Sequence, residues 1–404
     1  MRWPPSSSAT CADAGRAASG CDARSSPVSA RLARLRIGAL YAGGFLGPFG
    51  GGVVSSMLPE MGADLGVSTG SAASTLSAYL FPFALAMLVS GTLGARWGRV
   101  RTVRLAYLLY VVSSLLCAVA PTLDLLLGAR ALQGIGNSFT TPLLLASLAA
   151  VTPRERLGRV LGTFGALQAA GQTSAPLVGG LAAEFDWRYA FVVLAVVAAI
   201  LGLVGLPAAT APSTPGGRPE RLRDALTVPV LRVAVVALLG WGALGGLNFL
   251  VAFRAEDTFG LSSTQRGLLL TVFGVAGILV ARRVGGLIDR IGPRRAIVGA
   301  APVGAVLIAL AGTMPSLVVV GLVWAAAGVA SQFILVGVNA AVLGSSGANR
   351  GGAVSVVQSF RFSGAAFAPL ALTPLYAVHP TSAFVIPAVL LAVVAPLVMT
   401  GRKT

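Results

Sequence analysis

The residues of this sequence with the most evident binding chemistry are polar side chains that stand within long apolar runs. Arg130, Gln133 and Asn137 follow one another at i, i+3 and i+7, so they share one face of a helix. Amide and guanidinium groups bind ligands by hydrogen bonds and charge, so we expect such residues to line a substrate cavity. The alternative is that they join neighbouring helices by hydrogen bonds. The remaining members of this set are Gln168, Gln172, Asn248, Gln332, Asn339, Gln358 and Arg361.

Acidic residues avoid the middle of every apolar run. Six lie towards one end of their runs, namely Glu60, Asp64, Glu184, Asp186, Glu256 and Asp257, and Asp289 lies towards the other end. If the protein binds protons, either an end-of-run acid such as Glu60 or Glu184 carries them, paired with Arg130, or the proton site is unusual. Central arginines without a central acid would also disfavour cationic ligands and favour neutral or anionic ones.

Residue counts exclude several other kinds of site. His379 is the only histidine and Lys403 the only lysine, so the sequence has neither a histidine metal cluster nor a lysine-containing phosphate loop. Cys11, Cys21 and Cys117 have no metal-ligand or disulfide-framework spacing. We therefore predict no metal, no cofactor and no enzyme activity.

The elements that carry these residues are expected to be membrane-spanning helices. Of the 404 residues 55% are hydrophobic and only 11% charged, with a mean hydropathy of +0.84, whereas a soluble domain carries roughly a quarter charged residues. Apolar runs near the length of a bilayer span recur from residue 37 to residue 400. We predict twelve spans, at about 37–58, 71–94, 103–120, 125–149, 157–184, 187–207, 229–253, 265–288, 295–313, 315–343, 351–376 and 381–400.

The net charge of +17 fits a membrane orientation better than a nucleic-acid partner. With a cytoplasmic N-terminus, most of the 30 basic residues fall in cytoplasmic segments, which is the positive-inside pattern. We predict a multi-pass protein of the inner (plasma) membrane with both termini cytoplasmic. Its environment is the lipid bilayer, and it binds no nucleic acid.

The chain also reads as two repeats. A shift of 194 residues aligns Gly66 with Gly260 and Gly134 with Gly328, and a shift of 193 aligns Gly171 with Gly364. The predicted organisation is a disordered cytoplasmic tail (1–36), a six-helix bundle (37–207), a cytoplasmic linker (208–228) and a second six-helix bundle (229–404). Two parallel six-span repeats with a site between them are one of the ways in which secondary transporters are built.

Two loop motifs support the duplication and suggest a family. GTLGARWGRVR (91–101) and GGLIDRIGPRR (285–295) resemble the inner-loop signature of the major facilitator superfamily. In that family the motif acidic residue helps latch the two bundles on the cytoplasmic side; Asp289 matches it in the second copy, but Ala95 replaces it in the first, so we expect a weaker latch there. The predicted gating residues are Gly91, Arg96, Gly98, Arg99, Arg101, Gly285, Asp289, Arg290, Gly292, Arg294 and Arg295.

Two further motifs strengthen the resemblance. RALQGIGN (130–137) is similar to a fourth-span pattern of the superfamily, and GALQAAGQTSAPLVGG (165–180) resembles the "antiporter" motif of its drug-efflux branch, with Ala175 where the family has glycine. Small residues and a proline allow close helix packing and a bend. The predicted packing residues are Gly165, Gly171, Pro176, Gly179 and Gly180.

The resemblance implies an all-α membrane protein with twelve transmembrane helices in two pseudo-symmetric six-helix bundles. It also implies a monomeric secondary transporter that exports a small molecule, drug-like or metabolic, by proton antiport through alternating access. Metabolite uptake by proton symport is the first alternative, and a non-transporting membrane sensor or partner is the second.

Overall fold

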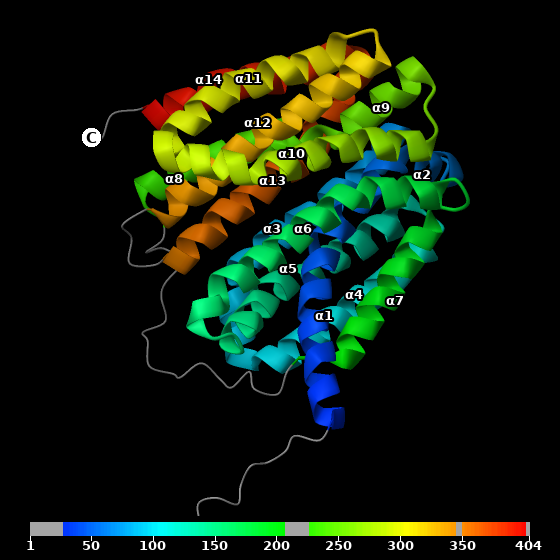
Figure 1. The fold of residues 1–404 in the computed structure, drawn as a ribbon. Coiled ribbons are helices and arrows are strands. Elements are labelled where there is room, and N and C mark those ends of the chain that lie inside the picture. The colour runs from blue at the N-terminus through cyan, green and yellow to red at the C-terminus, as the bar shows by residue number, and fades with distance from the viewer. Residues whose placement is uncertain (1–26, 207–225, 345–349, 401–404) are drawn as a thin grey trace, which may run out of the picture.

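We describe a computed structural model of the chain for residues 27–206, 226–344 and 350–400, in which every regular element is a helix (Figure 1). The first half contains α1 (Pro27–Gly52), η1 (Val53–Ser56), α2 (Leu58–Asp64), α3 (Thr69–Trp97), α4 (Arg99–Ala118), α5 (Leu123–Ala150), α6 (Arg154–Ala183) and α7 (Arg188–Val204). The second half contains α8 (Val228–Ala243), η3 (Gly245–Leu247), α9 (Asn248–Phe259), α10 (Ser263–Ile291), α11 (Pro293–Thr313), α12 (Leu317–Leu343), α13 (Arg350–Val378) and α14 (Pro380–Thr400).

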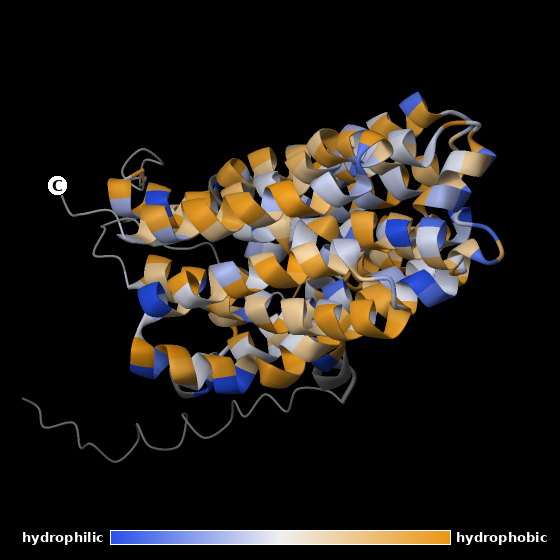
Figure 2. Cartoon of the chain, turned by 90° about the horizontal axis from the view of Figure 1, so that it is seen from above, coloured by the Kyte–Doolittle hydropathy of each residue, from blue (hydrophilic) through white to orange (hydrophobic). Residues whose placement is uncertain are grey.

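The helices have the length and surface that a bilayer requires. Eight segments among the described residues are long and apolar enough to cross a membrane. Large apolar side chains point outwards along them: Leu279, Val318 and Leu322 are 72%, 71% and 67% exposed, which is unfavourable in water but normal against lipid. Figure 2 shows apolar residues along the helices and hydrophilic ones mainly towards their ends.

The two halves repeat the same backbone conformations. Gly66 and Gly260 have φ of 66° and 63°, and Gly98 and Gly292 have φ of 87° and 86°. Positive φ is easy only for glycine, so each pair marks an equivalent turn 194 residues apart. The first pair precedes α3 and α10 at one end of the molecule, which we call the Gly66 end, and the second pair follows these helices at the opposite end, the Gly98 end.

Close helix contacts repeat as well. A Cβ on Gly134 would collide with the carbonyl of Tyr79, and a Cβ on Gly328 would collide with the carbonyl of Phe273, again 194 residues further on. The residues aligned by the shift of 193 behave in the same way, since Gly171 lies on the carbonyl of Phe45 and Gly364 on that of Leu238. Close backbone approach at small residues is typical of helix packing in membranes.

The first and seventh predicted spans are interrupted rather than continuous. The first predicted span covers the end of α1 and η1, and the seventh is divided into α8, η3 and α9. Consecutive glycines, Gly50–Gly52 or Gly245–Gly246, lie at each interruption; glycine weakens a helix by about 1 kcal/mol relative to alanine. Apolar residues continue through both breaks, so hydropathy alone does not reveal them.

Helices α1 to α7 pack mainly with one another, as do α8 to α14, and the contacts between these two halves are mostly those of α6 with α10 and of α3 with α13 (Figure 1). The boundaries differ slightly from those expected. Residues 27–36 belong to α1 rather than to the predicted tail 1–36, and the rest of that tail lies outside the described residues. The predicted linker 208–228 also lies outside them apart from its last three residues, with Val228 already helical.

Candidate functional site

The main internal cavity lies between the two halves and has a volume of about 340 Å³. Helices α1, α3, α5 and α6 line it from the first half, and the α8–α9 segment, α12 and α13 line it from the second. Seven predicted cavity residues reach it: Asn137, Gln168, Gln172, Asn248, Asn339, Gln358 and Arg361. Among the described residues that line it there is no Asp or Glu, and Arg361 is the one charged side chain.

Arg361 is held against two aromatic rings in this cavity. Its guanidinium carbon lies 4.0 Å from the centroid of the Trp241 ring and 4.6 Å from that of Phe362, and its Nη1 donates to Gln358 Oε1 at 3.3 Å. Aromatic faces stabilise a cation without neutralising it. The Arg361 Nε is buried and has no hydrogen-bond partner among the described residues. Because no acidic residue of the described lining neutralises the guanidinium, its positive charge remains for a ligand.

Arg130 and Gln133 do not line the cavity, contrary to expectation. Arg130 is completely buried within the first half, where Nη1 donates to Gly50 O at 3.1 Å and to Gln133 Oε1 at 2.5 Å, and Nε donates to Thr75 O at 3.4 Å. The guanidinium also lies 4.3 Å from the Tyr79 ring. These contacts fit the alternative interpretation, in which the side chain joins neighbouring helices. The i, i+3, i+7 spacing identifies the face of α5 that carries Arg130, but it does not show how closely α1 and α3 pack over that face.

Asn137 and Gln332, two further residues predicted to line the cavity, also differ in their positions. Asn137 reaches the cavity, with its Nδ2 donating to Gly47 O at 2.7 Å and to Tyr79 Oη at 2.5 Å. Gln332 is not among the cavity-lining residues, because its side chain packs against Gly277 of α10. Gln133 donates through Nε2 to Ser114 Oγ at 2.8 Å on α4.

The glycines of α6 have three separate neighbours. Gly171 packs on the Phe45 carbonyl of α1, Gly179 on the Val53 carbonyl of η1, and Gly180 on the Ser263 carbonyl of α10, across the halves. Pro176 lines the cavity and its carbonyl accepts from Ser56 Oγ at 2.5 Å. Gly165 lines the cavity and has open space at its Cβ position, so close packing does not explain it.

The two loop motifs lie at the Gly98 end, and the bonds of their described residues stay within one half. Arg99 donates to Ala146 O of α5 at 3.4 Å, and Arg294 donates to Thr400 O of α14 at 3.0 Å, each within its own half. In the described part of the chain no motif residue, Asp289 included, forms a hydrogen bond or ion pair with the opposite half. Gly98 and Gly292 form the turns described above, Gly285 has open space at its Cβ position, and the surroundings of Gly91 and Ala95 lie outside the described features. The other motif members are Arg96, Arg101, Arg290 and Arg295.

The Gly66 end, in contrast, is joined across the halves by a charged cluster that sequence reasoning missed. Arg266 of α10 is only 2% exposed and donates through Nε to Ser56 O at 3.1 Å and through Nη1 to Leu261 O at 2.9 Å. Its Nη2 forms an ion pair with Glu60 of α2, and its Nη1 lies 3.6 Å from Glu256 Oε2 of α9. Glu60 is therefore paired with Arg266 and not with Arg130; the alignment of the repeats gave no sign of this pairing.

A second acid also crosses the halves at this end. Glu184, which follows α6, accepts from Thr264 N at 3.1 Å at the start of α10. Hydrogen bonds from the Ser262 side chain and then from Thr264 lower the pKa of Glu184 below its ordinary value. Two further hydrogen bonds join the halves between α3 and α13: Ser77 Oγ donates to Ala366 O at 2.7 Å, and Ser359 Oγ donates to Ala84 O at 2.8 Å.

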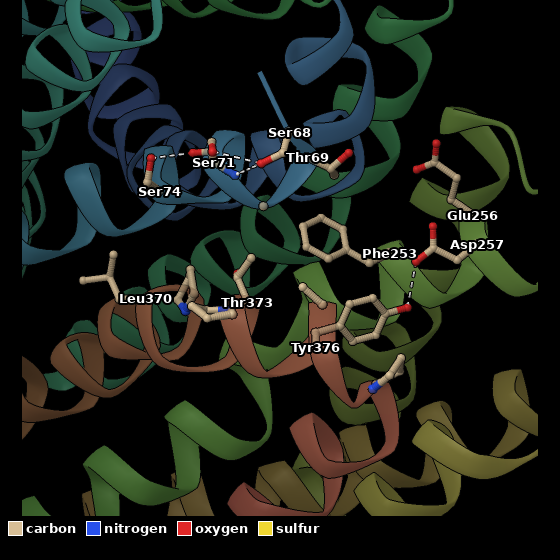
Figure 3. Close-up of a pocket in the computed structure, with 15 residues that line it drawn as sticks. Ser68, Thr69, Ser71, Ser74, Phe253, Glu256, Asp257, Leu370, Thr373 and Tyr376 are labelled. Atoms are coloured by element: carbon tan, nitrogen blue, oxygen red, sulfur yellow. Dashed lines mark hydrogen bonds between the residues drawn. The ribbon is translucent and has the colours of Figure 1, made fainter. Parts of the chain in front are cut away.

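A second pocket, of about 690 Å³, opens at the Gly66 end beside this cluster. Figure 3 shows Ser68, which caps α3, and Thr69 and Ser71 of α3 along one side, with Asp257 and Tyr376 opposite them. Tyr376 Oη donates to Asp257 Oδ2 at 3.0 Å. Glu256 lines the same pocket, so one carboxylate of the Arg266 cluster is open to solvent here.

Comparison with known proteins identifies the family. The sequence profile described as "Major Facilitator Superfamily" matches residues 40–323. The chain belongs to the major facilitator superfamily.

Relatives of this superfamily chain include proteins named for drug resistance. It is 34% identical over 241 residues to "Puromycin resistance protein pur8" of Streptomyces alboniger, covering 58% of this chain and 44% of that one. It is 31% identical over 212 residues to the "Uncharacterized MFS-type transporter Rv1877" of Mycobacterium tuberculosis, covering 52% of this chain and 30% of the relative. The match thus spans less than half the length of these two relatives.

Solved structures share the fold of this superfamily chain. The crystal structure of the human organic anion transporter MFSD10 matches with a TM-score of 0.64 at 19% identity, covering 90% of this chain and 99% of the other. The crystal structure of a mutant of the nucleoside transporter NupG matches with a TM-score of 0.74 at 15% identity, covering 91% and 100%. Family and fold together make this chain a multi-pass membrane protein with the fold of the major facilitator superfamily.

Proposed function

We propose that this transporter is a secondary active exporter of the inner (plasma) membrane, which moves a small molecule outwards by proton antiport. Its twelve spans form two pseudo-symmetric six-helix bundles, 37–207 and 229–404, that rock about the central cavity as a monomer. The tail 1–36 and the linker 208–228 are cytoplasmic. One observation carries the proposal: a cavity with polar side chains takes its lining from both halves, and hydrogen bonds join the halves on the Gly66 side of it.

The distribution of arginines supports an orientation. Arg96, Arg99 and Arg101 lie at the Gly98 end together with Arg294 and Arg295. Basic residues favour the cytoplasmic side of a membrane, so the Gly98 end is cytoplasmic in our proposal. The loop motifs are then positioned to latch the bundles when the cytoplasmic side closes. The bonded Gly66 end faces outwards and is closed, as expected for a conformation that receives substrate from the cytoplasm.

The cavity supports a neutral or anionic substrate with apolar or aromatic parts. Arg361 supplies positive charge that no acidic residue of the described lining compensates, and a low-dielectric cavity strengthens that field. Trp241, Phe83 and Phe249 supply apolar surface, and the amides supply donors and acceptors. Export in preference to uptake is supported by the relatives named for drug resistance.

A vesicle experiment tests direction and coupling together. Everted membrane vesicles that contain the transporter are energised and given a panel of neutral, anionic and cationic compounds, with puromycin among them, with and without an uncoupler. We expect uncoupler-sensitive accumulation of neutral or anionic compounds in everted vesicles. Accumulation in right-side-out vesicles alone would overturn the proposed direction, and accumulation that survives the uncoupler would overturn proton coupling.

A further inference from the structure

We propose that Glu60 and Glu256, held together by Arg266 across the two halves, bind the coupling proton on the outer side, and that the proton is held at Glu256. This inference rests on the proposed antiport, because it names the site at which the proton and the outer gate are linked.

The first step concerns the charges that closure brings together. Glu60 comes from the first half, Glu256 from the second, and both contact the guanidinium of Arg266. Arg266 is buried, and a buried guanidinium needs a charged partner; Glu60 forms an ion pair with it. Closing the halves therefore places a second carboxylate beside an ion pair that is already neutral. Protonation of one acid removes the excess negative charge.

The second step identifies which acid takes the proton. The carboxylates near Arg266 are Glu60 on α2, Glu256 and Asp257 on α9, and Glu184 after α6. Glu60 accepts from Arg266, Asp257 from Tyr376, and Glu184 from Thr264. Glu256 alone of these four accepts no hydrogen bond from any residue in the described part of the chain; its nearest charged group is the Arg266 Nη1 at 3.6 Å. An acid without donors gains least from staying ionised.

The third step is access for the proton. Glu256 lines the pocket at the Gly66 end, which is the outer end in our orientation (Figure 3). On the opposite side of the cluster, Ser56 accepts from Arg266 through its carbonyl and donates through Oγ to Pro176 O, and Pro176 lines the central cavity. The cluster thus lies between the outer pocket and the substrate cavity.

The resulting linkage has a definite sign. Repulsion between Glu60 and Glu256 is absent when the halves separate, so the closed state binds the proton more tightly than the open state. A higher external proton concentration then favours closure of the outer side. That is the direction required of an inward-moving proton in antiport, because the protonated transporter must turn from the outside to the inside.

The test uses a cysteine that only outer opening exposes. Ser77 is 3% exposed and bonded across the halves to Ala366, so Ser77→Cys is introduced after Cys11, Cys21 and Cys117 are replaced by alanine. A membrane-impermeant maleimide is applied from outside without substrate. Labelling at each pH is divided by that of the same cysteine in the unfolded protein, because the thiolate fraction also changes with pH. We expect this ratio to rise about tenfold between about pH 5.5 and about pH 8, because a like charge in contact changes the proton affinity of a carboxylate by roughly tenfold.

Three variants separate the roles. Glu256→Gln mimics the protonated acid and is expected to label slowly at every pH. Glu60→Gln removes the ion pair that crosses the halves and leaves Arg266 with Glu256 of its own half, so it is expected to label fast at every pH. Asp64→Asn is the matched control on α2, because Asp64 pairs with Arg188 inside the first half, and it should keep the parent pH profile. A pH response that survives in Glu256→Gln, or that disappears equally in Asp64→Asn, would overturn the proposal.

The vesicle experiment distinguishes this inference from the proposed function. Flat labelling in the parent together with uncoupler-sensitive export would reject the cluster as the proton site and leave antiport standing. A pH response in labelling without uncoupler-sensitive export would support the proton-linked gate and reject antiport.

Discussion

At the scale of single residues, two arginines that were both predicted to line the cavity lie in different surroundings. Arg361 projects into the cavity between two aromatic rings, whereas Arg130 is enclosed by backbone carbonyls of α1 and α3. Their spacing along the chain identified both as facing inwards, but only packing decides whether an inward face meets a cavity or another helix. The position of Arg266 could not be predicted either, because nothing local in the sequence links it to Glu60, 206 residues away.

The role of Arg361 makes a prediction about substrate charge. Replacing Arg361 by Gln keeps hydrogen-bonding capacity and removes the cation. We expect uptake of an anionic substrate into everted vesicles to fall by a factor of ten or more, since an ionic contact in a low-dielectric site is worth about 1.5–3 kcal/mol, while a neutral analogue of similar size changes less than threefold. Equal losses for both compounds would contradict an anion-binding role.

Glu184 makes a prediction about pH. Its pKa is lowered by hydrogen bonds from Ser262 and Thr264, so its contribution to the outer contact is present above the ordinary carboxyl pKa and is lost only as the pH falls through the lowered value. Between about pH 5.5 and about pH 8 Glu184 stays ionised. We expect Glu184→Gln to raise labelling of Ser77→Cys by a similar factor at both pH values. A change in the pH dependence itself would show that Glu184 titrates in this range.

At the scale of elements, most helices could be predicted, whereas their interruptions could not. Apolar run length fixed the helices because a bilayer demands about twenty apolar residues. The breaks at η1 and η3 were hidden because apolar residues continue through them, and only the consecutive glycines Gly50–Gly52 and Gly245–Gly246 mark the places. The loop glycines were predictable from the repeat, and their paired positive φ values agree with it.

The packing glycines make a prediction with an internal control. Gly171 and Gly165 lie on the same helix, but a Cβ on Gly171 would collide with the Phe45 backbone whereas one on Gly165 meets nothing. We expect Gly171→Ala to destabilise the protein by about 1–3 kcal/mol through overpacking, seen as a lower melting temperature in detergent. Gly165→Ala should leave the melting temperature unchanged or raise it slightly. A similar drop in both variants would contradict the packing described.

At the scale of the whole molecule, bonds join the halves at the Gly66 end, and none of the described motif residues at the Gly98 end bonds across the halves. The described bonds between the halves include the Glu60–Arg266 ion pair and the Ser359–Ala84 hydrogen bond. They lie at or near the contacts of α6 with α10 and of α3 with α13. The described motif residues bond only within their own halves. The duplication was predictable because equivalent glycines recur at a nearly constant shift. Which end is closed was not predictable, since it depends on contacts between residues that are distant in the chain.

The most direct test of alternating access is a pair of distance measurements by double electron–electron resonance. One pair of spin labels, at Phe185 and Ser316, reports on the Gly66 end, and a second pair, at Arg156 and Leu343, reports on the Gly98 end; all four side chains are exposed. When substrate is added or the pH is changed, we predict that one distance lengthens as the other shortens. Distances that stay constant, or that change in the same direction, would contradict rocking of the two halves about the central cavity.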